Sequence, residues 1–99
     1  MPFRIVIRSH ARAQLLSIYD YIADAASPDI AERYTNGIVD HLSVLTEYPL
    51  IGAPRDDILP GLRTLIHRRR VTIAFIVEET DVVVMGFYYG GQDFATLLR

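Results

Sequence analysis

The chain has 99 residues, a length that fits one domain with one hydrophobic core. It has no cysteine, which excludes disulfides and thiolate metal sites and argues against an oxidising compartment, where small domains usually need such cross-links. Its 10 basic residues, all arginine, are outnumbered by 12 acidic ones, and the formal charge of −2 argues against broad attraction to nucleic acid.

Apolar residues make up 51% of the sequence, which is above the usual share. A domain of this size hides only about two-thirds of the surface of its unfolded chain, so we expect an apolar face that a protein partner covers. No basic leader with an apolar segment follows Met1, and no uncharged run approaches about 18 residues. We therefore expect a cytoplasmic protein with no membrane association.

The first part of the chain predicts one strand and one helix. Residues 3–8 alternate in the two-residue period of a strand with one buried face. Ser9 is then expected to cap a helix, since apolar residues recur at steps of three and four behind it. The stripe consists of Ala11, Leu15, Ile18, Ile22 and Ala25.

A second helix is predicted directly after the first. Ser27-Pro28-Asp29 combines a capping hydroxyl, a proline suited to the first helical position and an acidic first turn. Pro49 and Gly52 end the helix beyond Tyr48, and the short link at 26–27 predicts an antiparallel helix hairpin. Its apolar stripe is Ala31, Tyr34, Ile38, Leu42 and Leu45.

The second half of the chain predicts a three-stranded antiparallel meander. Residues 52–61 form a loop rich in Pro and Gly, and residues 62–67, 71–77 and 82–89 are β-branched or aromatic runs of strand length. The run 71–77 is almost wholly apolar, as expected of a central strand. The sequence thus predicts a single α+β domain over 1–99 with element order βααβββ.

No catalytic residue, metal or cofactor is assigned from the sequence. The three histidines lack metal-ligand spacing and are expected to be exposed: His10, His41 and His67. Ser9-His10 has no third member of a triad, and Asp56-Asp57 would point in different directions on regular backbone. Gly90-Gly91 has no Lys-Ser or Lys-Thr behind it, so a phosphate loop is excluded.

Positive charge is concentrated in the second half, where Arg63 is followed by Arg68-Arg69-Arg70. Three adjacent guanidiniums at a strand junction can bind carboxylate or phosphate groups bidentately, which makes all four arginines candidate target-binding residues. The alternative is a solvated sheet edge that prevents pairing with other chains.

Four segments resemble the RelE/ParE toxin superfamily when taken in order. Residues 13–22 resemble the signature of its first helix, and Leu-x-x-x-Pro-x-x-Gly at 45–52 resembles the exit from its second. Residues 61–63 are similar to the Gly-x-Arg that opens its second strand, and 91–93 to the close of the last strand. The resemblance covers nearly the whole chain and implies a small bacterial toxin of a type II toxin-antitoxin system.

The superfamily has two branches with different targets. Ribonucleases of the RelE type cut messenger RNA on the ribosome with basic and tyrosine residues, but Thr72, Gln92 and Leu98 occupy the corresponding places here and supply neither a cation nor a proton. ParE-type members inhibit DNA gyrase without hydrolytic residues, so the resemblance favours this branch and implies a ParD-like antitoxin. A RelE-like nuclease that uses Arg68–Arg70, and a nontoxic member, are the alternatives.

Two further sets of residues are predicted to meet partners. Leu16, Tyr19 and Ala23 widen the apolar stripe of the first helix and predict a groove for an amphipathic antitoxin helix. Phe94, Leu97 and Leu98 lie on a terminal segment too short for a stable isolated helix, so they either seal the protein's own sheet or dock onto gyrase.

Overall fold

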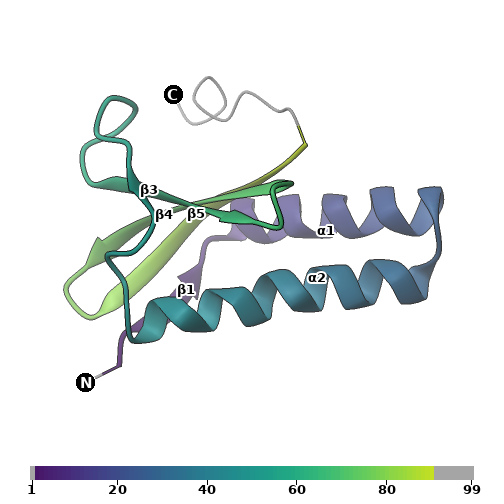
Figure 1. Ribbon diagram of the computed structural model, residues 1–99, viewed down its shortest axis with the longest axis horizontal. Helices are drawn as coiled ribbons and strands as arrows, with labels where there is room; N and C mark the ends of the chain where they lie inside the picture. Colours follow the sequence, from purple (N-terminus) through teal and green to yellow (C-terminus); the bar gives the residue numbers. More distant parts are fainter. Residues whose placement is uncertain (1, 91–99) are drawn as a thin grey trace.

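The computed structural model describes residues 2–90 as one sheet with a helix hairpin packed on one of its faces (Figure 1). In chain order the elements are β1 (Arg4–Ile7), α1 (Ser9–Ala25), α2 (Pro28–Leu42), the 3₁₀ turn η1 (Ser43–Thr46), β2 (Ala53–Pro54), β3 (Leu62–His67), β4 (Val71–Glu78) and β5 (Asp81–Tyr89). The predicted α+β class, helix hairpin and three-stranded meander are confirmed.

The sheet has the strand order β1-β5-β4-β3-β2. The meander strands β3, β4 and β5 pair antiparallel, whereas β1 pairs with β5 in parallel, with Arg4 opposite Asp81. A parallel pair requires a long crossover, which the helix hairpin and the meander together supply. The first strand of the chain therefore lies beside the last.

The main core lies between the helices and the sheet. Helix α1 packs against both α2 and β5. Ile18, Ile38 and Phe75 are almost fully buried there, since each lies on the inward face of its element. Position 25 differs from the prediction: Ala25 is exposed at the end of α1, where no strand lies beneath the helix stripe.

The two helix starts differ. Ser27 caps α2 as predicted, because its hydroxyl accepts a hydrogen bond of 3.2 Å from the backbone N–H of Ile30. Ser9 does not cap α1 and is already its first helical residue, while Arg8 takes the capping position with no side-chain bond. Strand β1 runs to Ile7, which leaves only Arg8 between the two elements.

Two other predicted boundaries are corrected. Helix α2 ends at Leu42, and the turn η1 places Leu45 in the core. The predicted loop 52–61 contains the short strand β2, which pairs with β3. Gly52 precedes β2 with φ of 88°, and a Cβ there would collide with the carbonyl oxygen of Thr64. Only glycine fits this close approach.

A bulge in β5 links the sheet to α1. The register between β4 and β5 shifts at Ala74/Phe75, which leaves Met85 unpaired. The backbone N–H of Phe87 then donates to Oε1 of Gln14 at 3.0 Å. A helix side chain thus binds a backbone N–H of β5 two residues beyond the bulge.

Candidate functional site

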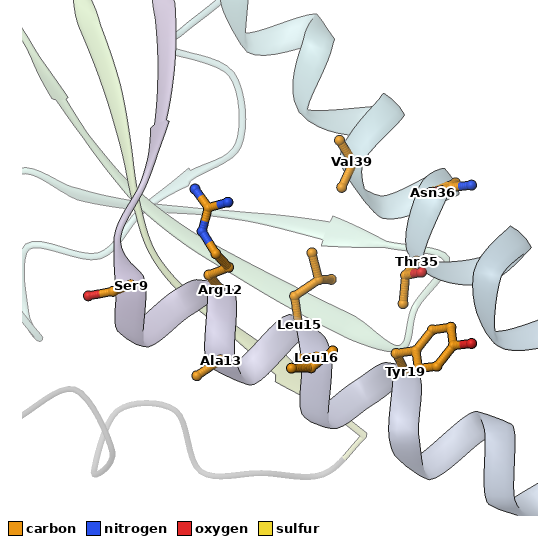
Figure 2. A pocket seen from close by; sticks show the side chains of 9 residues that line it. All are labelled: Ser9, Arg12, Ala13, Leu15, Leu16, Tyr19, Thr35, Asn36 and Val39. Atoms are coloured by element: carbon orange, nitrogen blue, oxygen red, sulfur yellow. The ribbon is translucent and has the colours of Figure 1, made fainter. Parts of the chain in front are cut away.

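An apolar groove lies over the helix hairpin and has a volume of about 570 Å³. Figure 2 shows its lining side chains, which come from the first half of α1 and the middle of α2. We call this surface the helix groove; its residues are Ser9, Arg12, Ala13, Leu15, Leu16, Tyr19, Thr35, Asn36 and Val39. The described part of the chain leaves it open.

The helix groove is apolar because its polar groups are few or already satisfied. Leu16 is 61% exposed and Val39 is 43% exposed, which is unusual for side chains of this kind in facing positions. The hydroxyl of Thr35 donates to the carbonyl of Ala31 at 3.0 Å, so its methyl group is left for the groove. The groove therefore offers apolar area to a partner.

The sequence-predicted antitoxin residues fall partly on this surface. Leu16 and Tyr19 line the helix groove, and in Figure 2 they lie on α1 beside Leu15. Ala23 is half-buried and packs against the main core one turn further along the helix, outside the groove. Leu15 was absent from the prediction because it was assigned to the core-facing stripe of the first helix, whereas Val39 lies off the predicted stripe of the second helix and was assigned to no surface.

A basic turn, Arg68–Arg70, connects β3 to β4, and its three residues are exposed. The backbone N–H of Arg70 donates to the carbonyl of His67 at 3.0 Å, and the two residues between them, Arg68 and Arg69, have φ of 49° and 61°. Positive φ at both central residues is the type I′ geometry that Asn-Gly normally adopts. Arginine in this region costs about 1–2 kcal/mol per residue.

Arg63 does not belong to the basic turn. Its side chain donates to the backbone carbonyls of Leu50 and Ile51, and thereby fastens the segment before β2 to β3. It lies at the opposite end of β3 from Arg68, roughly 15 Å away along an extended strand. The predicted four-arginine patch is therefore split into a structural arginine and an exposed triplet. None of these four arginines forms an ion pair within residues 2–90.

Two of the three histidines differ from the prediction: His10 is exposed as expected, whereas His41 and His67 are not. His67 is only 5% exposed, and its Nδ1 lies 2.9 Å from Nδ1 of half-buried His41. Burial, followed by His41 and Arg68, lowers the pKa of His67. Both positions could have been recognised: His67 shares the inward parity of Leu65 on β3, and His41 follows Ile38 on the buried stripe of α2.

Aromatic rings continue from this pair across the hairpin. Tyr34 meets His67 edge-on at 5.9 Å and Tyr89 at 6.0 Å, and Tyr89 in turn lies 5.7 Å from Tyr21 of α1. Burial, followed by Tyr89, raises the pKa of Tyr34, while Arg70 and Arg68 act in the opposite direction. These rings lie between the sheet and both helices and are adjacent to the basic turn.

Nothing in the described region assembles a nuclease site around Thr72. Its register neighbours across the sheet are Ile66 and Tyr88, so no cation faces it from either adjoining strand. Within residues 2–90 no three metal-binding side chains are grouped, and neither helix is long and apolar enough to cross a bilayer. Phe94, Leu97 and Leu98 lie outside the described residues.

Comparisons with known proteins agree on one group. Residues 5–94 match the family described as ParE toxin of type II toxin-antitoxin system, parDE. The chain is similar to a structure of the chromosomal ParDE toxin-antitoxin system from P. aeruginosa, with 25% identity, a TM-score of 0.79, and coverage of 89% of this chain and 96% of that one.

A second structure, the toxin-antitoxin complex RelBE2 from Mycobacterium tuberculosis, is 17% identical with a TM-score of 0.58 and covers 90% of this chain and 99% of that one, which shows the shared fold. No curated protein matches the chain.

Proposed function

Because this chain belongs to the ParE toxin family of type II toxin-antitoxin systems, we propose that it arrests growth in the cytoplasm by binding DNA gyrase and that a ParD-like antitoxin neutralises it. The resemblance to a ParDE system over most of both chains supports the antitoxin partner. The toxin acts by binding alone, so no catalytic residue or cofactor is assigned.

The helix groove is the observation that carries the proposal. It exposes leucine and valine on two helices of one chain, and an amphipathic helix laid into it buries its own apolar face at the same time. Each Å² of apolar surface removed from water contributes about 25 cal/mol. We assign antitoxin binding to Leu16 and Tyr19, with Leu15 and Val39 beside them, and give Ala23 an indirect role beneath the surface.

The basic turn is the proposed target-binding element. Its three arginines are exposed, and two of them, Arg68 and Arg69, have a strained backbone. Backbone strain of this kind is common at functional sites. Phe94, Leu97 and Leu98 remain proposed target contacts, and deletion of residues 93–99 tests them: a folded, antitoxin-binding protein that no longer arrests growth supports the assignment, whereas unfolding overturns it. Arg63 retains a target role only through the strand that it fastens.

The test is expression of the toxin from a tight inducible promoter with and without its antitoxin. We expect growth arrest that the antitoxin relieves, and with purified gyrase we expect loss of supercoiling with accumulation of cleaved DNA. A parallel assay follows transcripts on ribosomes, where no cuts are expected. Transcript cleavage without an effect on gyrase would favour the RelE-like nuclease, and normal growth would favour a nontoxic member.

A further inference from the structure

The contact between His41 and His67 joins helix α2 to the residue that precedes the basic turn. The two Nδ1 atoms are 2.9 Å apart and the ring centroids 5.1 Å, so both nitrogens lie between the rings and point at one another. This is the arrangement of a hydrogen bond, in which one Nδ1 donates and the other accepts. His67 is the buried member and His41 the half-buried one.

The environment of Nε2 of His67 assigns the donor. This atom is buried and has no hydrogen-bond partner among the described residues. If His67 accepted at Nδ1, its Nε2 would carry an orphaned N–H, which is rarer in buried sites than a bare acceptor. His67 therefore donates from Nδ1 to His41, which then carries its own N–H on Nε2.

The number of ring nitrogens limits how many protons the pair can bind in acid while the contact remains. Two neutral imidazoles hold two protons on four ring nitrogens, and the contact requires that one Nδ1 stays bare. A third proton that leaves the contact intact must therefore occupy Nε2 of His67, where no acceptor waits. A fourth removes the last acceptor and places two cations against each other.

The surrounding groups act in the same direction. From α2, His41 and the edge of Tyr34 face His67; from the turn, Arg68 faces it; and Tyr89 of β5 and Arg70 border Tyr34. None of these groups supplies negative charge at neutral pH. Burial, then His41, then Arg68 accordingly lower the pKa of His67.

We propose that the His41–His67 contact is a proton-sensitive latch, which holds the basic turn against helix α2 at neutral pH and releases it on acidification. The latch adds to the proposed function but does not depend on which target the toxin binds. Because the folded protein resists protonation of His67, the unfolded chain takes up the proton first, at the ordinary histidine pKa of about 6.5. The stability that neutral His67 contributes is fully present above that pH. It is lost as the pH falls from there towards the lower pKa of the folded state.

An NMR titration of the full-length chain tests the latch without any substitution. The ring signals of His67 should titrate below the ordinary histidine pKa of about 6.5, since burial, His41 and Arg68 lower its pKa. The backbone amides of Arg68, Arg69 and Arg70 should shift with the same midpoint as His67. Titration of His67 at the ordinary histidine pKa, or turn amides that do not move, would overturn the proposal.

Urea unfolding at about pH 7.5 and about pH 5.5, on either side of the ordinary histidine pKa, provides a second readout. The unfolding equilibrium constant of the wild type and of His10→Gln should rise on acidification. His67 contributes at most about tenfold to this rise, because pH 5.5 lies about one unit below the ordinary histidine pKa of about 6.5. In His67→Gln the rise should shrink; an equal rise in all three proteins would contradict the latch. If His67→Gln does not fold, His41→Gln is used instead in the NMR titration, because it removes the partner at the half-buried position. The turn amides of this variant should no longer shift with the His67 midpoint.

Discussion

The helix groove and the basic turn are two exposed surfaces built in opposite ways. The groove is apolar, lies on helical backbone, and the hydroxyl of its half-buried Thr35 is satisfied by the carbonyl of Ala31. The turn is cationic and holds Arg68 and Arg69 in a backbone conformation that disfavours them. A surface of the first kind binds by burying area, and one of the second kind by charge presented at a fixed position. The two should therefore respond independently to substitution.

Leu16→Glu is expected to have the largest effect on binding. A carboxylate in the middle of the helix groove must be desolvated when an apolar partner helix docks, which weakens antitoxin binding by roughly 2 kcal/mol or about thirtyfold. Stability should change little, because Leu16 is already 61% exposed. Isothermal titration calorimetry with the antitoxin measures the loss.

Leu50→Glu is the matched control, since Leu50 is 66% exposed but lies outside the helix groove. It should bind the antitoxin as the wild type does. Equal affinity of all three proteins would show that the antitoxin binds elsewhere.

Replacing Arg68, Arg69 and Arg70 together by Ala should reduce binding to the target about tenfold, as expected for removal of several charge-assisted contacts. The melting temperature should stay near that of the wild type, because exposed arginines add little to stability and alanine is disfavoured at positive φ to the same degree. Gyrase inhibition and antitoxin affinity are measured side by side. Arg33→Ala on α2, which removes one exposed arginine elsewhere, serves as the control. Undiminished growth arrest by the triple variant would show that the turn is only a solvated sheet edge.

Arg68→Asn combined with Arg69→Gly separates charge from strain. Both residues accept positive φ, so the double variant should be more stable than the wild type by about 1 kcal/mol. Target binding should fall as in the triple variant, which would show that stability and function oppose each other at this turn. Urea midpoints of the wild type and both turn variants give the comparison, and a lower midpoint for the Asn-Gly protein would mean that arginine makes stabilising contacts there.

Gly37→Ala should have the smallest effect and concerns neither surface. Gly37 lies within α2, and a Cβ there would meet the ring of His67 at 3.8 Å, an ordinary contact distance. The gain in helix propensity predicts about 0.5 kcal/mol of added stability, with unchanged binding of antitoxin and target. Loss of stability would indicate that the His67 ring needs the space.

Local patterns predicted the elements well. Strand β3 spans the predicted residues, Ser27 caps α2, and the helix hairpin is formed as expected. The parallel pairing of β1 with β5 was beyond prediction, because alternation along one strand carries no information about its neighbour. Strand β2 was missed for a different reason: two residues in a loop rich in Pro and Gly give no periodicity.

The candidate site was predicted less completely. Leu16 and Tyr19 were recognised because they lie off the main stripe of α1, and the arginine triplet because of its charge. The role of Arg63 depends on carbonyls of a distant loop, and the His41–His67 contact on two residues 26 positions apart, so neither has a local signature. Such contacts become visible only once β3 is placed beside the segment before β2 and beside α2.

The parallel pairing of β1 with β5 also affects how the protein is made. Since β1 finds its neighbour only in the last described strand, a nascent chain on the ribosome cannot complete the sheet until synthesis is nearly finished. Helix α1 likewise lacks much of its packing surface until β5 emerges. A product of interrupted translation that lacks β5 therefore cannot complete this sheet.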